Sequence, residues 1–90
     1  MISEKVLVKN PSGFHLRPAG MFCQMAEGYK SKIHFNKGNN RDFNAKSILS
    51  VLGAGVMSGD EVEIICDGED EKEALDALIE LVNSGFGEKV

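Results

Sequence analysis

Two kinds of hydrophobic periodicity alternate along this chain, and their order limits the fold more than any other feature of the sequence. Apolar residues recur at spacings of three and four over residues 19–29 and 74–82, as they do along a helix with one buried face. Residues 32–36 and 61–66 alternate apolar and polar side chains instead, and an apolar run within residues 2–8 predicts a further strand. Each segment buries only one side, so the segments must pack in layers.

Turn and capping residues divide the rest of the chain into short elements. Residues 37–40 predict a hairpin turn, so that residues 41–44 return as a fourth strand. Ser47 is the expected N-cap of a short helix, and Gly53 is its expected end. The order is strand, helix, strand, strand, helix, strand, helix. It predicts an α+β open-faced sandwich, with a four-stranded antiparallel sheet and three helices on one face (βαββαβα).

The last helix has its own predicted boundaries. Asp70, followed three residues later by Glu73, forms a variant of the capping box. Acidic residues in the first turn of a helix are also favoured by its dipole. We therefore expect the helix to begin at Asp70 and to end near Gly85.

Length and composition indicate a single domain over residues 1–90 and exclude some classes of function. The net charge of −4 argues against non-specific nucleic-acid binding, which needs a basic face. No apolar run has the length of a membrane span and the first residues lack a signal-peptide pattern, so we expect a cytoplasmic protein without membrane insertion. A monomer is also expected. Cys23 and Cys66 lie on apolar faces and are expected to be packed thiols rather than metal ligands. His34 is expected to face solvent.

The segment Gly13-Phe14-His15-Leu16-Arg17-Pro18-Ala19 carries the candidate chemistry. Pro18 suits the first position of a helix, which makes Arg17 the expected N-cap. A helix start binds anions through free N–H groups and its dipole, and Arg17 adds a full positive charge. His15 is largely neutral near neutral pH and is therefore a nucleophile that can hold a phosphoryl group. The backbone donors expected to bind phosphate belong to Arg17, Ala19 and Gly20.

Taken alone, these residues also fit a surface histidine beside a solubilising arginine. A resemblance that extends beyond this segment favours a phosphoryl carrier instead. Residues 13–19 resemble the active-site motif of the HPr family, the histidine-containing phosphocarriers of the sugar phosphotransferase system. Asn44-Ala45-Lys46-Ser47-Ile48-Leu49 resembles the second signature of that family. The resemblance extends over nearly the whole chain, with Gly20 as a mild departure.

The resemblance implies specific roles and partners. His15 would be phosphorylated through its Nδ1 atom, with Arg17 as the charge partner of the phosphoryl group. Phosphoryl groups would pass from phosphoenolpyruvate through enzyme I to His15 and then to enzyme IIA components. The protein would be a stoichiometric carrier rather than an enzyme, and it would need no cofactor and no metal.

Ser47 has two interpretations. It caps a helix, and in many Gram-positive members of the HPr family the matching serine is phosphorylated by an HPr kinase/phosphorylase and read by a transcriptional regulator. Enteric members carry a similar serine without this regulation, so both interpretations stay open. An apolar patch for docking of partners is expected nearby, with Leu49 and Leu52 exposed and Ile48 shared with the core beside Val51. The candidate docking residues are Leu16, Ile48, Leu49 and Leu52.

Two other functions compete with the carrier. One is an HPr-like corepressor that acts only through phosphorylated Ser47, although such a protein need not keep His15 and Arg17. The other is a histidine-dependent phosphohydrolase, which needs an acid or base beside His15 to activate water. The nearest candidate for that role, Glu27, lies at the far end of the same predicted helix.

Overall fold

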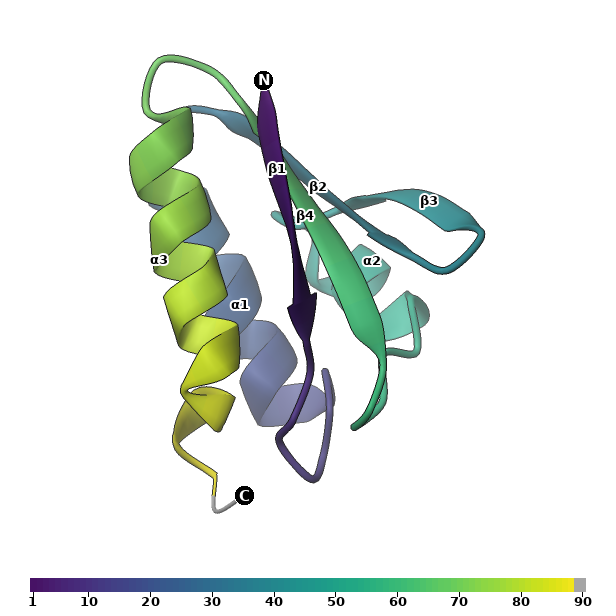
Figure 1. The fold of residues 1–90 in the computed structure, drawn as a ribbon. Helices are drawn as coiled ribbons and strands as arrows, with labels where there is room; N and C mark the ends of the chain where they lie inside the picture. Colours follow the sequence, from purple (N-terminus) through teal and green to yellow (C-terminus); the bar gives the residue numbers. More distant parts are fainter. Residues whose placement is uncertain (89–90) are drawn as a thin grey trace.

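The computed structural model describes residues 1–88 and has the predicted order of elements. Four strands form one sheet, three α-helices accompany it, and a single 3-10 turn (η1) follows the last helix. The α+β open-faced sandwich is confirmed (Figure 1). The elements are β1 (Ile2–Leu7), α1 (Leu16–Glu27), β2 (Lys32–Lys37), β3 (Asn40–Asn44), α2 (Ile48–Gly53), β4 (Glu61–Asp67), α3 (Glu71–Asn83) and η1 (Gly85–Gly87).

The strands lie in the order β1-β4-β2-β3, and all neighbours are antiparallel. β4 lies inside the sheet and pairs on one side with β1 and on the other with β2. The register places Val6 opposite Val62 and Phe35 opposite Ile64, and all four side chains are buried. The alternation in the sequence therefore marks the inner face of the sheet correctly.

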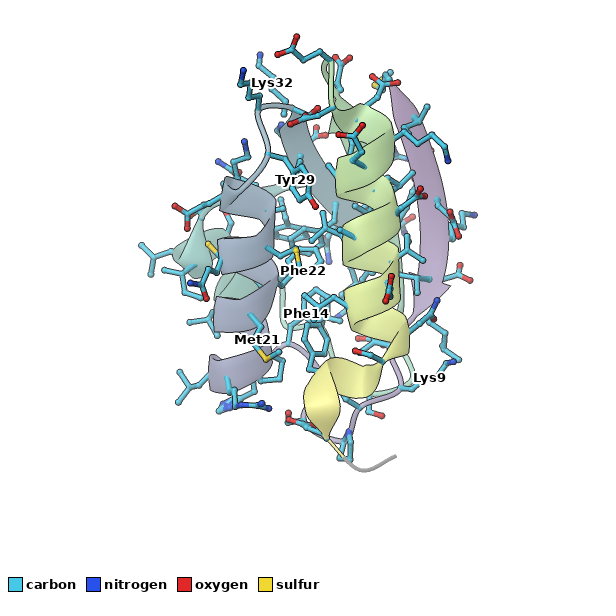
Figure 2. All side chains as sticks on the ribbon, turned by 90° about the vertical axis from the view of Figure 1, so that its left-hand side faces the viewer. Lys9, Phe14, Met21, Phe22, Tyr29 and Lys32 are labelled. Atoms are coloured by element: carbon cyan, nitrogen blue, oxygen red, sulfur yellow. The ribbon has the colours of Figure 1, made fainter. Side chains whose placement is uncertain are left out.

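The helices cover the inner face, and α1 packs against both α2 and α3. Figure 2 shows Phe14 and Phe22 between α1 and α3, pointing into the space between the two helices. The ring centroids of these two residues are 4.9 Å apart, and Phe35 of the sheet meets Phe22 edge-on at 5.6 Å. Such aromatic contacts add to the free energy gained by burying apolar area. The core therefore extends from the sheet to the loop just before His15.

The start of α3 differs from the prediction. Asp70 is the N-cap residue, but its side chain makes no capping hydrogen bond. Its carboxylate instead accepts hydrogen bonds from the N–H groups of Lys30 and Ser31 at 2.8 and 2.9 Å and from the Ser31 hydroxyl. The capping box with Glu73 is therefore wrong, because a contact across the fold takes the carboxylate. α3 ends at Asn83, two residues before the predicted end.

Both cysteines are free and buried, as predicted. Burial raises the pKa of the Cys66 thiol to about 11. His34 lies on the outer face of the sheet, as predicted, but its side chain is half-buried there, and its Nδ1 atom is buried without a hydrogen-bond partner in the described part of the chain. Within residues 1–88, no helix has both the length and the apolar character needed to cross a membrane.

Candidate functional site

A tight loop before α1 fixes the direction in which His15 points. The N–H of Gly13 donates to the carbonyl of Asn10 at 3.1 Å, and the N–H of Phe14 donates to the carbonyl of Val56 at 3.0 Å. Gly13 has a φ of +60°, and a Cβ atom there would lie 2.4 Å from the Val56 carbonyl oxygen. Phe14 is buried and His15 is exposed. The buried phenylalanine therefore anchors the loop and directs the next side chain toward solvent.

His15 is also the N-cap residue of α1. Its backbone is extended, with φ −86° and ψ −170°, and its carbonyl accepts the N–H of Ala19 at 2.7 Å. The prediction that Arg17 is the N-cap is therefore wrong by two residues. Pro18 lies at the third helical position rather than the first. A proline is tolerated there too, because the N–H groups of the first turn have no intrahelical acceptor.

The earlier helix start moves the free backbone donors closer to His15. The N–H of Ala19 is already used by the His15 carbonyl, so the prediction that it binds phosphate is wrong. Gly20 lies one residue deeper, where a helical N–H bonds to the carbonyl four residues back. The N–H groups of Leu16 and Arg17 occupy the first two helical positions, which have no intrahelical acceptor. A helix start of this kind favours a bound anion.

Arg17 is exposed, and a segment that follows α3 binds its guanidinium group. Nη1 donates to the carbonyl of Phe86 at 3.0 Å. Glu88 lies in the same segment, and its carboxylate accepts hydrogen bonds from Ser12 and Asn10 in the loop before α1. These bonds, those from Ser12 first, hold the pKa of Glu88 below its ordinary value, and the charge of Arg17 acts in the same direction. The sequence did not predict the role of this segment, because its contacts join residues that are 69 to 78 positions apart along the chain, and no local pattern indicates such contacts.

Ser47 is the N-cap of α2, as predicted. Its Oγ atom accepts the N–H of Ser50 at 3.3 Å, and its carbonyl accepts the N–H of Val51 at 3.0 Å. The side chain is half-exposed. A phosphoryl group on this hydroxyl would stand at the start of a helix that packs against α1.

The candidate docking residues differ in exposure. Leu16 is 70% exposed and Leu49 is 80% exposed, and they belong to two helices that pack together. Ile48 is 41% exposed, so the prediction that it joins the core is wrong. Leu52 is only partly exposed and packs against the core. Val51 is the fully buried residue of the six-residue helix α2. The four residues therefore do not form one uniformly exposed patch.

Met57 was not predicted as part of this surface. It is 68% exposed and lies directly beside the loop before α1, since a Cβ on Gly13 would approach its Cα to 2.8 Å. The glycine-rich stretch around Met57 has no hydrophobic periodicity, so the sequence does not show that Val56 is buried and Met57 is exposed.

Metal binding or hydrolysis at His15 would each need further side chains beside it. Within residues 1–88, no three side chains of histidine, cysteine, aspartate or glutamate are grouped so that they could hold a metal ion. Glu27 is the last residue of α1 and accepts a hydrogen bond from the Cys23 thiol at 3.5 Å. A helix rises about 1.5 Å per residue, which places Glu27 more than about 15 Å along the axis from His15. Glu27 therefore cannot activate a water molecule at the histidine.

Comparison with known proteins shows similarity over the whole chain. Residues 2–84 match the family model described as the PTS HPr component phosphorylation site. The chain is 40% identical over 78 residues to the HPr-like protein Crh of Bacillus subtilis (strain 168), which covers 87% of this chain and 91% of that protein. It is 35% identical over 88 residues to the phosphocarrier protein HPr of Neisseria meningitidis serogroup A / serotype 4A, which covers 98% of each. The crystal structure of HPr-C-His from Thermoanaerobacter tengcongensis matches with a TM-score of 0.95 and 39% identity over 100% of both chains.

Proposed function

The chain belongs to the HPr family of phosphocarrier proteins, and we propose that it accepts a phosphoryl group on His15 from phosphorylated enzyme I and passes it to enzyme IIA components. Members of this family are carriers of the sugar phosphotransferase system rather than catalytic enzymes. Exchange with these two partners would take place in the cytoplasm. The observation that carries the proposal is an exposed His15 at the very start of a helix, next to the free N–H groups of Leu16 and Arg17.

The chemistry follows from this arrangement. The lone pair of the His15 Nδ1 atom attacks the phosphorus atom carried by the donor protein, and a new N–P bond forms. The donor's own bond to phosphorus breaks, and its electron pair stays with the donor. The incoming group carries negative charge, which the N–H groups of Leu16 and Arg17, the helix dipole and the Arg17 guanidinium are placed to stabilise. The second transfer repeats these steps with the chain as the donor.

The proposal is tested by incubating the chain with phosphoenolpyruvate and enzyme I and measuring its intact mass at neutral and then acid pH. We expect a gain of one phosphoryl group that is lost in acid and absent in His15→Ala. Because His15 is exposed, His15→Ala should unfold at nearly the wild-type urea concentration, which serves as the control. A folded chain that gains no mass beside active enzyme I would contradict the proposal.

Regulation through Ser47 is a second proposed function. It is supported by the half-exposed hydroxyl at the start of α2 and by the similarity to the HPr-like protein Crh. Phosphorylation by an HPr kinase/phosphorylase would add about two negative charges next to the docking surface. This would weaken binding to enzyme I and provide a contact for a transcriptional regulator. A protein that acted only as such a corepressor would not need His15 to be phosphorylated.

The Ser47→Asp variant tests this coupling. We expect slower phosphorylation of His15 by enzyme I than in the wild type, with Ser47→Ala close to the wild type. The alanine variant loses the hydrogen bond to Ser50 and about 1 kcal/mol of stability, so it controls for the loss of the cap. Equal transfer rates for Ser47→Asp and the wild type would refute the coupling.

A further inference from the structure

Residues 85–88, which we call the strap, fold back over the loop that precedes α1. The Glu88 carboxylate accepts a hydrogen bond from the N–H of Ser12 at 3.2 Å and from its hydroxyl at 2.5 Å. It also accepts the side-chain amide of Asn10 at 3.2 Å. These partners are 76 to 78 positions apart in the sequence. The carboxylate therefore joins the end of the fold to the loop that carries His15.

The strap also reaches Arg17 and the aromatic core. The carbonyl of Phe86 accepts the Nη1 hydrogen of Arg17 at 3.0 Å, and a Cβ on Gly87 would lie 3.7 Å from Nη2. The Phe86 ring is fully buried and meets Phe14 edge-on, with centroids 5.7 Å apart. The guanidinium group that is expected to bind phosphate is thus already bound by a neutral carbonyl.

The backbone of the strap is in an unfavourable conformation. Phe86 has φ 56° and ψ 27°, in the left-handed region that residues with a side chain rarely adopt. Such strain persists only where surrounding contacts enforce it. The Oδ1 atom of Asn10 is buried and has no hydrogen-bond partner among residues 1–88. The contacts of Glu88 and Arg17 therefore hold the strap closed against an internal cost.

A phosphoryl group on His15 would change the charges that hold the strap. It adds about two negative charges beside Arg17. A guanidinium binds phosphate in charge-assisted pairs, which are stronger than its bond to a neutral carbonyl such as that of Phe86. The same charges repel the carboxylate of Glu88, whose pKa is held low by Ser12 so that it stays ionised.

We propose that the strap closes over the unphosphorylated site through Glu88 and Arg17, and that phosphorylation of His15 opens it. The inference rests on the proposed phosphorylation of His15. An open strap gives the phosphorylated chain a surface next to His15 that the unphosphorylated chain does not present. The donor protein and the acceptor protein therefore meet different surfaces on the same carrier.

Hydrogen exchange of the full chain tests the inference. The protein is compared before and after treatment with phosphoenolpyruvate and enzyme I, with phosphorylation measured by intact mass. The amides of the strap, including the Glu88 N–H that donates to the Gly85 carbonyl at 2.9 Å, are expected to exchange about tenfold faster or more after phosphorylation. In unphosphorylated Glu88→Gln, the strap should also exchange faster, because a neutral amide oxygen accepts weaker hydrogen bonds than a carboxylate.

Two further variants control for charge and for the loop. Glu73→Gln makes the same change of charge at an exposed position of α3 and should leave exchange of the strap unchanged. Ser12→Ala removes one donor to the Glu88 carboxylate and should give an intermediate increase. An increase in Glu73→Gln equal to that in Glu88→Gln would refute the role of Glu88.

The outcomes of the main experiment are distinguishable. Faster exchange of the strap together with a gain of one phosphoryl group supports both proposals. A gain of mass with unchanged exchange overturns the strap and leaves the carrier function intact. No gain of mass overturns the carrier function and, with it, the opening of the strap by phosphorylation.

Discussion

Replacement of Gly13 by alanine should destabilise the chain far more than the same replacement at Gly38. Both residues have positive φ, +60° and +57°, so an alanine at either position is forced into the left-handed region at a cost of about 1–2 kcal/mol. At Gly38, in the turn between β2 and β3, a Cβ meets no atom within 4 Å. At Gly13 it would lie 2.4 Å from the Val56 carbonyl oxygen and 2.8 Å from the Met57 Cα, so the backbone must move.

The additional cost at Gly13 can be worked out from these contacts. Forcing extra atoms into a packed site costs about 1–3 kcal/mol. The shift also strains the hydrogen bond from the Phe14 N–H to the Val56 carbonyl, which is worth about 1 kcal/mol. The gain from restricting the unfolded chain is the same for both variants and cancels. Gly13→Ala should therefore lose about 2–4 kcal/mol more than Gly38→Ala, a large share of the roughly 5–13 kcal/mol expected for a domain of this size.

Urea denaturation followed by circular dichroism measures this difference. With a slope of about 1 kcal/mol per molar urea, the midpoint of Gly13→Ala should lie about 2–4 M below that of Gly38→Ala. The loop also directs His15, so the initial rate of phosphorylation by enzyme I should fall in folded Gly13→Ala and not in Gly38→Ala. Equal midpoints for the two variants would refute the idea that contact with Val56 is what requires glycine at position 13.

Three further results are expected. Gly20→Ala should raise the free energy of unfolding by about 1 kcal/mol in urea titrations, because Gly20 is helical and a Cβ there meets no atom within 4 Å; a loss of stability would contradict this. The Cys66 thiol, with a pKa of about 11, should resist iodoacetamide at pH 8 in the folded chain and react in urea, as measured by mass spectrometry; rapid alkylation of the folded chain would show that it is not buried. The bonds from the Ser31 hydroxyl and the Lys30 N–H lower the pKa of Asp70, so its contribution to stability should be complete above the ordinary aspartate pKa and be lost as pH falls through the lower folded value. Asp70→Asn should flatten that loss in urea midpoints measured between neutral and acid pH, and parallel curves for the two proteins would contradict it.

The elements of the fold were predictable because each one buries a single face. The stripe of α3 and the alternation in β4 identify their buried residues, and Phe14 separates the anchored loop from the exposed His15. Helix boundaries were harder to predict. Pro18 fits several positions of a first turn, and the assumption that it stands at the first one put the predicted start of α1 two residues too late.

The remaining errors come from contacts across the fold. Asp70 has a good local reason to cap α3, but the backbone of Lys30 and Ser31 competes for its carboxylate and wins. Ile48 was assigned to the core from a helix too short for its pattern to define a face. Glu88 joins the site through partners at the other end of the chain, and nothing near it in the sequence indicates this.

The strand order also determines when the sheet can form during synthesis. Among the described strands β1 pairs with β4 alone, and 60 residues separate the end of one strand from the end of the other. At about 5–20 residues per second, a ribosome takes about 3–12 s to supply the missing partner. Throughout that interval the nascent chain has Val6 and Val8 without the neighbours that later bury them, and the unpaired backbone groups of a strand can pair with other chains. The rate of translation through residues 8–67 therefore sets how long both edges of β1 stay unpaired, whereas in the finished sheet β4 covers one of them.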